Sequence, residues 1–308
     1  MLGGSGFIGT NLVKLLSENG LKVTATYFSN FPKFQNKNVE YIQSDARNLE
    51  DNIKLFKNFQ YIFICSAITS GSHVIRNNPM LHFHDNNVMN TRVLEAASIA
   101  KVKRILFISS STVYPNKDHE MHESDVTGEF FPAYEIVASM KRYFEKAFQI
   151  YAKSSFSNLE TVIVRPSNAF GEFDDFDWET SKVVPALIRK FVEKNNPIEV
   201  WGDGNDIKDF IYCQDLVTGL VYAMFLAKSG EIYNIASGKS NTIKDLVKIL
   251  IDLSSSEVNV NFNTSVPSMI PIRRISTHKA ESELGFKAKV SFKEGIQRTF
   301  NWYQTQKI

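Results

Sequence analysis

The chain begins with MLGGSGFIGTNLVKLL, residues 1–16, and this stretch decides the fold class. Glycines at positions 3, 6 and 9 are followed by the apolar spacing of a helix. This pattern is typical of dinucleotide-binding folds, in which glycine permits a tight turn, a close approach to a pyrophosphate and close packing of helix on strand. The helix N-terminus then offers free N–H groups to the phosphates. The residues expected at the dinucleotide are Gly3, Ser5, Gly6, Phe7, Ile8 and Gly9.

The strand that should precede this turn is almost absent from the sequence. The first strand of such a fold is central in the sheet and has about five or six residues, whereas only Met1 and Leu2 precede Gly3. A missing central strand would leave the ladders of both neighbours unpaired. Two explanations stay open: the natural start lies upstream, or the chain is a degenerate member of its fold. If the start lies upstream, a chain extended by one natural strand should be more stable and bind cofactor more tightly.

Composition fits a soluble protein with one large or two modest domains. The chain has 308 residues, 43% of them hydrophobic, and 35 basic against 33 acidic residues give a charge of +2. This balance argues against a nucleic-acid or anionic-membrane partner. Two distant cysteines, Cys65 and Cys213, and six histidines without ligand spacing predict neither a disulfide framework nor a metal site. The scarcity of cysteines favours a reducing, cytoplasmic location, and no membrane span or signal peptide is recognised, so the chain is expected to be soluble.

The order of apolar runs predicts an α/β fold. Helical patterns separate the β-rich runs KVTATY (22–27), YIFICSA (61–67), RILFISS (104–110) and TVIVRP (161–166). Near-continuous apolar strands between amphipathic helices predict a doubly wound, Rossmann-like parallel sheet over residues 1–165. Loops rich in Asp, Asn and Gly predict a smaller C-terminal substrate domain over residues 166–308, with a return to the first domain near 209–236.

Further motifs carry a family resemblance. They are SDAR (44–47), NVMNT (87–91), SSSTVYP (109–115) with Tyr134 following, and RPSNAFG (165–171). In this order they resemble the extended short-chain dehydrogenase/reductases, namely the NAD-dependent epimerases and dehydratases of nucleotide sugars. ETSKVVPALIRKF (179–191) and VWGDGNDIKDF (200–210) are most similar to the GDP-fucose synthase branch, whose members are 3,5-epimerase/4-reductases. The resemblance implies an NAD(P)-dependent oxidoreductase or epimerase, a nucleotide-sugar substrate and a homodimer.

The resemblance also places the cofactor. Asp45, with Ala46 beside it, matches the residue that contacts the adenine, although an Asp here could equally cap the next helix. NAD-using members carry an acid where this chain has Tyr27, and the absence of that acid favours NADP over NAD. Ser29, Asn30 and Lys33 nearby point the same way. The other positions matched to the cofactor are Ser66, Ala67, Asn87, Ser109, Tyr134, Lys141, Pro166 and Asn168.

The family's catalytic pattern is only partly present. Ser110 matches the serine that hydrogen-bonds the reacting sugar oxygen. The family's Tyr-x-x-x-Lys pair has two registers here, Tyr134 with Ala138 or Val137 with Lys141, and both are broken. In the family the lysine lowers the tyrosine pKa from ~10 toward neutrality. A surface-exposed Lys141 without a role is a third alternative.

The substrate positions carry their own departures. Thr112 and Lys182 match the base cysteine and acid histidine of the GDP-fucose synthases, and a threonine hydroxyl is too weak an acid to supply the base. This argues against the 3,5-epimerase step and leaves hydride transfer at C4 unaffected. Cations in segments that flank the diphosphate pair naturally with phosphate. The expected substrate-binding set is Ser110, Asn168, Lys182, Lys190, Lys208 and Arg273, with Arg274 beside it.

Three functions therefore stay open. The first is an oxidoreductase or epimerase of the GDP-fucose-synthase kind, with Ser110 and Tyr134 at the reacting oxygen. The second is a protein that binds cofactor or nucleotide sugar without efficient catalysis, which Ala138 and the short first strand would explain. The third is a UDP-sugar 4-epimerase, which needs no base at Thr112. All three predict ligand binding, and only the first and third predict turnover.

Overall fold

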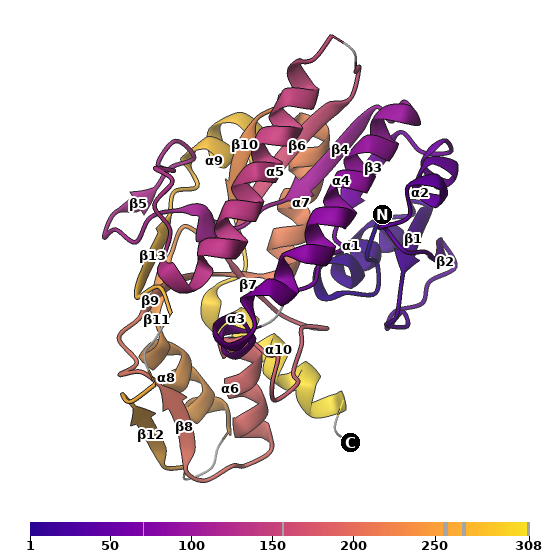
Figure 1. Ribbon diagram of the computed structural model, residues 1–308. Helices are drawn as coiled ribbons and strands as arrows, with labels where there is room; N and C mark the ends of the chain where they lie inside the picture. The colour runs from indigo at the N-terminus through magenta and orange to yellow at the C-terminus, as the bar shows by residue number, and fades with distance from the viewer. Residues whose placement is uncertain (70, 156, 255–257, 267–268, 307–308) are drawn as a thin grey trace.

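The computed structural model describes residues 1–69, 71–155, 157–254, 258–266 and 269–306. Its first half, the larger of its two parts, is a parallel sheet with helices on both faces. Its strands lie in the order β10-β6-β4-β3, with β1 and β2 as a further parallel pair. Their bounds are β1 Val23–Tyr27, β2 Val39–Gln43, β3 Tyr61–Ile64, β4 Arg104–Ile108, β6 Glu160–Pro166 and β10 Ile232–Ile235. The predicted doubly wound fold is confirmed (Figure 1).

Met1 and Leu2 join β1 to β3. Leu2 forms a parallel bridge with Ile64, and its N–H donates to the carbonyl of Phe63 at 2.9 Å. On the other side, the N–H of Thr26 donates to the carbonyl of Met1 at 2.8 Å. The structure therefore does not confirm a missing strand, because two residues in its place pair with both neighbours.

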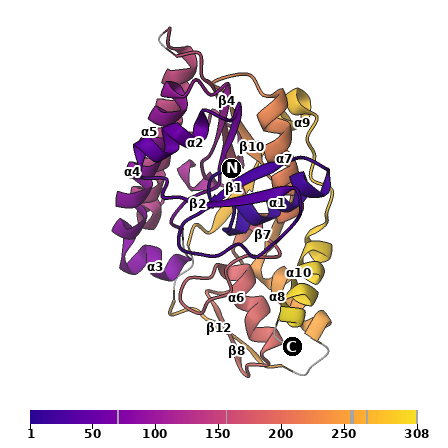
Figure 2. The same cartoon turned by 90° about the vertical axis from the view of Figure 1, so that its right-hand side faces the viewer.

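Helices cover the two faces of this sheet (Figure 2). One face carries α2 (Leu49–Phe56), α4 (His84–Ile99) and α5 (Glu135–Lys153), and the other carries α1 (Phe7–Glu18), α7 (Cys213–Leu226) and α9 (His278–Leu284). Each face of the sheet thus has its own hydrophobic core: the first lies under α2, α4 and α5, and the second under α1, α7 and α9. Side chains along β4 point alternately to the two faces, so Ile105 and Phe107 enter the first core and Leu106 the second, which explains the long apolar run.

The second half is smaller and lies below the first in Figure 1. Its sheet has the order β11-β9-β13-β5, with β7 on β9, and β12 pairs with β8. The strands are β5 Glu120–Met121, β7 Asn168–Phe170, β8 Ile198–Trp201, β9 Ile207–Tyr212, β11 Ser240–Thr242, β12 Val260–Asn263 and β13 Ile272–Ile275. The helices are α6 Val183–Val192, α8 Ile243–Ser254 and α10 Phe292–Gln306.

The chain returns to the first half through α7 and β10. Leu216, Leu220 and Tyr233 from this return segment lie in the core that covers α1. The division of the chain at residue 165 stays a prediction. The remaining short elements are α3 Ser72–Asn77 and the 3-10 turns η1 Pro79–His82, η2 Ser111–Val113 and η3 Pro132–Tyr134. Within the described residues, no helix combines the length and apolar character needed to cross a membrane.

Candidate active site

The turn before α1 contains glycines that the fold requires and one that it does not. Gly3 has a φ of +73°, and a Cβ at Gly9 would lie 2.0 Å from the carbonyl oxygen of Gly3, so both positions need glycine for the fold itself. Gly6 has a φ of −79°, and the described protein atom nearest to an added Cβ is the Gly3 oxygen at an ordinary 3.6 Å. No described part of the chain requires glycine at position 6. The space above it is therefore open for a ligand.

The start of α1 suits an anion. Gly6 is the N-cap and supplies no side-chain acceptor, and the first turn carries no acidic residue. The first N–H groups of an α-helix have no partner within the helix, and its dipole favours negative charge there. Just after β3, the buried Ser66 Oγ has no hydrogen-bond partner among the described residues, and the Ser66 backbone lies against Gly3. This orphaned hydroxyl beside an uncapped helix and an open glycine fits a bound dinucleotide.

Asp45, the residue matched to the adenine contact, is already engaged within the chain. Arg47 bonds both of its carboxylate oxygens, at 3.0 Å through Nε to Oδ1 and 2.8 Å through Nη2 to Oδ2, and these bonds lower the pKa of Asp45. Arg47 also pairs with Asp85 at 3.0 Å and lies over the Phe28 ring at 5.3 Å. The alternative that Asp45 caps the next helix is wrong, because Asn48 is the N-cap of α2.

Sequence reasoning missed Arg47. The signal for it was its place in the SDAR motif, two residues after Asp45. Its second partner, Asp85 on α4, is distant in sequence, so the motif alone could not indicate that contact. Ala46 is partly buried and packs against the core below α2 and α4, and its place beside the cofactor stays a prediction.

The reactive hydroxyls follow the end of β4. Thr112 donates to Ser110 Oγ through its hydroxyl at 2.9 Å and through its N–H at 3.1 Å, and both residues are half-buried. Ser109 differs, because it is buried and its Oγ donates to Glu145 Oε1 at 2.5 Å. The structure thus assigns Ser109 a contact within the core and leaves the Ser110–Thr112 pair at the site.

Lys141 lies at the same end of β4. Its Nζ donates to the carbonyl of Ile108, the last residue of β4, at 2.8 Å and lies 4.8 Å from the centroid of the Phe107 ring. Burial lowers the pKa of Lys141 to about 8, against the opposing charge of Glu145. A surface-exposed Lys141 is therefore wrong. Of the two registers, Val137 with Lys141 puts the lysine at β4, whereas Ala138 is fully buried and leaves no room for a lysine.

Tyr134 stands outside this helical register. It is the last residue of η3, seven positions before Lys141, and is half-buried. The N–H of Tyr134 donates to the carbonyl of Phe131 at 2.8 Å, which closes the 3-10 turn. The short helix α3 packs against this turn. Tyr134 thus lies in a turn that precedes α5, and its place at the site stays a prediction.

A buried cation, Arg273, contacts the loop that follows β4. Arg273 is 2% exposed, and its guanidinium donates to the carbonyls of Tyr114 at 3.1 Å and Pro115 at 2.9 Å. Its Nε has no partner, and no carboxylate pairs with it among the described residues. Burial lowers the pKa of Arg273 to about 10. Its charge is therefore held in place without a counter-charge.

The other expected cations are engaged or lie elsewhere. Lys208 is opposite Arg273 in the β9–β13 register, and it pairs with Asp206 at 3.2 Å and bonds the carbonyls of Met269 and Ile270. Lys190 donates to the carbonyl of Glu199 on β8 at 2.7 Å. Lys182 is exposed and lies 5.6 Å from the centroid of the Phe7 ring, at the start of α1. The structure thus brings Lys208 to Arg273 and Lys182 to the glycine turn.

Two expected polar contacts are used within the fold. Asn168 Nδ2 donates to the carbonyl of Asp209 at 2.9 Å, which joins β7 to β9. Asn87 Nδ2 donates to the carbonyl of Phe83 at 2.6 Å within the first turns of α4. Each amide oxygen still has acceptor capacity for a ligand. Pro166 ends β6 at the same edge of the sheet.

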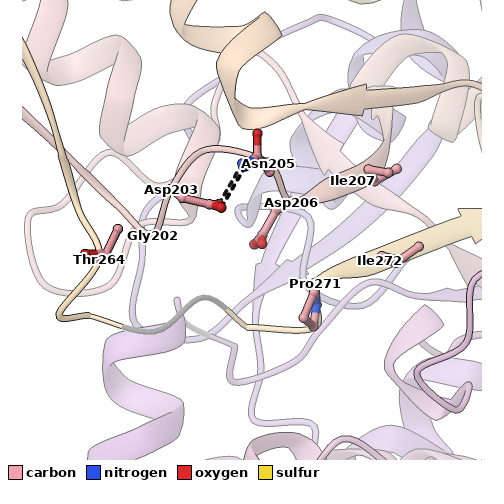
Figure 3. A pocket seen from close by; sticks show the side chains of 8 residues that line it. All are labelled: Gly202, Asp203, Asn205, Asp206, Ile207, Thr264, Pro271 and Ile272. Carbon is pink, nitrogen blue, oxygen red and sulfur yellow. Dashed lines mark hydrogen bonds between the residues drawn. The ribbon is translucent and has the colours of Figure 1, made fainter.

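A cavity of about 520 Å³ is lined by residues of the β8–β9 loop and of β13, among them Ile207 and Ile272, the chain neighbours of Lys208 and Arg273. It lies between the β8–β9 loop and the start of β13, with Ile207 and Ile272 on its wall (Figure 3). Asp203 and Asp206 bring carboxylates to its rim, and Asp203 is bonded to Asn205 at 2.7 Å. These carboxylates are hydrogen-bond acceptors and can pair with N–H donors of a ligand.

A buried polar chain joins these parts, and sequence reasoning missed it. Glu145 accepts from Ser109 and from Arg165, whose Nε and Nη2 lie 2.8 Å from the two carboxylate oxygens. Arg165 donates to the Tyr114 hydroxyl at 2.9 Å, and the Tyr114 ring lies between Arg165 at 5.0 Å and Arg273 at 6.0 Å. The Lys-x-x-x-Glu spacing of Lys141 and Glu145 was the one signal for this chain of contacts.

Comparison with known proteins extends over the whole fold. The sequence model of a family described as NAD dependent epimerase/dehydratase matches residues 1–236. A putative GDP-L-fucose synthase 2 from Arabidopsis thaliana is 29% identical over 308 residues, which covers 98% of this chain and 90% of the relative. A probable GDP-L-fucose synthase 1 from Oryza sativa subsp. japonica is 30% identical over 251 residues, or 79% and 76% of the two chains.

Among solved structures, a UDP-N-acetylglucosamine 4-epimerase from Methanobrevibacter ruminantium, in complex with UDP-N-acetylmuramic acid, has the same fold. It superposes with a TM-score of 0.88 at 25% identity over 99% of this chain and 97% of that one.

We predict that Gly6→Ala weakens dinucleotide binding by about tenfold or more, because the new methyl group occupies the ligand's space. Its effect on stability should not exceed about 1 kcal/mol, the usual cost of alanine at an N-cap. Gly9→Ala is the matched control and should lower the melting temperature markedly, because its Cβ meets a backbone oxygen at 2.0 Å. Titration with dinucleotide and thermal melting check both, and equal affinity for wild type and Gly6→Ala would contradict the open-space argument.

Proposed function

Since the chain belongs to the NAD-dependent epimerase/dehydratase family, we propose that it catalyses hydride transfer at a sugar carbon of a nucleotide sugar, as a reductase of the GDP-fucose-synthase kind. One observation carries this proposal. The unpaired cation Arg273 is fixed to the carbonyls of Tyr114 and Pro115, in the loop that begins with Ser110 and Thr112. A diphosphate bound by this cation would therefore lie a few residues from the hydroxyls that face the sugar.

The residues present fit a nicotinamide dinucleotide, which supplies or accepts the hydride when bound. Gly6, the first N–H groups of α1 and Ser66 Oγ would hold its phosphates and adjoining ribose. Ser110 would hydrogen-bond the reacting sugar oxygen, with Thr112 orienting its hydroxyl. Lys182, above the start of α1, adds a cation at the phosphates.

The base we propose is guanine. Guanine presents N1–H and N2–H₂ donors on one edge, whereas uracil presents one N–H. The carboxylates of Asp203 and Asp206 at the cavity between the β8–β9 loop and β13 are acceptors of the matching kind. The relatives named as GDP-L-fucose synthases support the same choice.

A UDP-sugar 4-epimerase is the second candidate. The absence of a base at Thr112 favours it, because 4-epimerisation needs hydride and proton transfer at C4 and no proton removal beside the keto group. Consumption of reduced cofactor with a GDP-4-keto-6-deoxy sugar would support the reductase. Interconversion of UDP-hexoses without net cofactor consumption would support the epimerase instead, and ligand binding without either reaction would support a binding protein.

We predict that Arg273→Met weakens binding of a GDP-sugar by about ten- to a hundredfold, because hydrogen bonds to charged groups contribute about 1.5–3 kcal/mol. The fold should tolerate methionine, since the change removes an unpaired buried charge. Arg274→Met is the matched control: Arg274 is the next residue, is exposed to solvent and pairs with Asp118 at 3.0 Å. Calorimetric titration checks both, and equal losses in the two variants would contradict a diphosphate role for Arg273.

We propose NADP(H) as the preferred cofactor. No acid follows the end of β1 at Tyr27, and Arg47 lies over Phe28 where a 2′-phosphate would sit. The pairs of Arg47 with Asp45 and Asp85 are partly exposed and so are weak enough to be exchanged for a phosphate.

NADPH should bind about tenfold or more tightly than NADH, and Arg47→Leu should abolish that difference. Arg92→Leu, which removes a solvent-exposed arginine from α4, serves as the control. Fluorescence titration of both reduced cofactors measures the preference. Tighter binding of NADH by the wild type would refute it.

We also propose a homodimer through α4 and α5. These helices expose Val88, Ile99, Tyr143 and Ile150, with exposed fractions of 47%, 52%, 63% and 51%. Burial of such side chains stabilises by about 1.5–3 kcal/mol each. A two-fold axis beside these helices would bury the patch against itself.

The double change Tyr143→Glu with Ile150→Glu should convert the dimer to a monomer at micromolar concentration. Phe225→Glu is a control of similar exposure, at 50%, on the other face of the molecule. Sedimentation velocity reports the outcome, and a monomeric wild type across this range would rule the dimer out.

A further inference from the structure

The proton donor for the sugar oxygen is the open question of this site. The family position for the catalytic tyrosine, four residues before the lysine, holds Val137, which has no proton to give. The nearest tyrosine, Tyr134, lies in the turn before α5 rather than in the helical register. Proton transfer at this site therefore needs another group.

Lys141 reaches the place that the tyrosine would occupy. Side chains on an α-helix lean toward its N-terminus, so Lys141 covers the turn that contains Val137. Its Nζ is tied at 2.8 Å to the carbonyl of Ile108, two residues before Ser110. The ammonium group is thus held at the end of β4, where the Ser110–Thr112 hydroxyls begin.

We propose that Lys141, rather than Tyr134, donates the proton to the reacting sugar oxygen, and accepts it in the reverse direction. This inference rests on the proposed function. In the reducing direction, the sugar carbonyl carbon gains a hydride from the nicotinamide and its oxygen gains a proton from the Lys141 ammonium. The C=O bond becomes CH–OH, the dinucleotide is oxidised, and the neutral amine regains its proton from water.

The charged groups around Lys141 allow this role. On its own helix, Glu145 raises the lysine pKa, but that carboxylate is already paired with Arg165 on β6 and with Arg142. On η1, His82 is buried and its pKa is lowered by burial, so it adds no positive charge near neutrality. Burial then prevails and brings the pKa of Lys141 to about 8. A donor with this pKa is protonated at neutral pH and can release its proton there.

The pH dependence follows with a definite sign. Below about pH 8 Lys141 is an ammonium and can act as the acid, and above it the amine can act only as a base. The rate of sugar reduction should therefore fall as pH rises through about 8, and the rate of oxidation should rise. A tyrosine acid without a lysine beside it would instead keep reduction fast up to about pH 10.

Four variants test the assignment. Lys141→Met should lower kcat by about a hundredfold or more, the usual contribution of a general acid. Lys141→Arg should stay equally slow, because a guanidinium with pKa above 12 does not release its proton at neutral pH. Tyr134→Phe should lower kcat far less than Lys141→Met does, because its phenol is not the proton donor. Lys146→Met, which removes an exposed lysine from the same helix, should change nothing.

A readout independent of turnover accompanies these rates. Acetylation of each lysine by acetic anhydride, followed by mass spectrometry across pH, reports the titration of Lys141 directly in the cofactor-free chain. Its labelling should rise with a midpoint near 8, well below the ~10.4 of an unperturbed lysine. Dinucleotide titration of Lys141→Met should give an affinity within about tenfold of wild type, which separates proton transfer from binding.

The possible outcomes distinguish a failure of the Lys141 assignment from a failure of the proposed function. Loss of activity in Tyr134→Phe with activity kept in Lys141→Met would overturn this inference and leave the proposed function intact. A labelling midpoint for Lys141 near 10 would overturn it as well. Absence of turnover in the wild type with GDP- and UDP-sugars alike, despite dinucleotide binding, would overturn the proposed function and this inference with it.

Discussion

The buried ion pair between Glu145 and Arg165 is the contact on which the site depends. Both side chains are almost fully enclosed, at 0% and 1% exposure. Burial alone would raise the pKa of Glu145, but the bonds from Arg165 hold it below its usual range. Loss of one partner from such a pair costs about 3–5 kcal/mol, because the other charge is left buried and unpaired. The pair fixes α5 against β6, and it is this attachment that holds Lys141 at the end of β4.

The same pair extends into a network that joins the two halves of the molecule. The Tyr114 hydroxyl accepts from Arg165 and donates to Asn234 on β10 at 2.6 Å. The amide of Asn234 reaches the carbonyls of Met121 and Ser276, so the network continues to β5 and the end of β13. Buried polar networks with every member satisfied select one arrangement of the elements they join. The distance between the cation Arg273 and the loop at Ser110 is set in this way, by bonds rather than by a hinge.

The sequence predicted what depends on local pattern. Apolar runs covered on both faces indicated the parallel sheet, and the glycine spacing indicated the turn before α1, because both follow from neighbours in the chain. Contacts between distant segments were not predictable in this way. Asp45 pairs with Arg47, which in turn meets Asp85 from α4, and Ser109 is drawn into the core by Glu145. The register of Lys141 was equally undecided until the carbonyl of Ile108 was found beside its ammonium group.

Three features at this site have no explanation within the residues that the structure describes. Gly6 is a glycine that no described neighbour requires, Ser66 Oγ is a buried hydroxyl without a partner, and Arg273 is a buried cation without a counter-charge. The last two destabilise the free protein, since a buried polar group left unpaired costs about 1–3 kcal/mol. A bound anion or hydroxyl would remove these costs, and its affinity would include the free energy so recovered. Two independent costs that bound ligands would relieve, beside a glycine that leaves space for one, are a stronger argument for a dinucleotide and a diphosphate than the glycine motif, because a motif can persist in a fold that has lost its ligand.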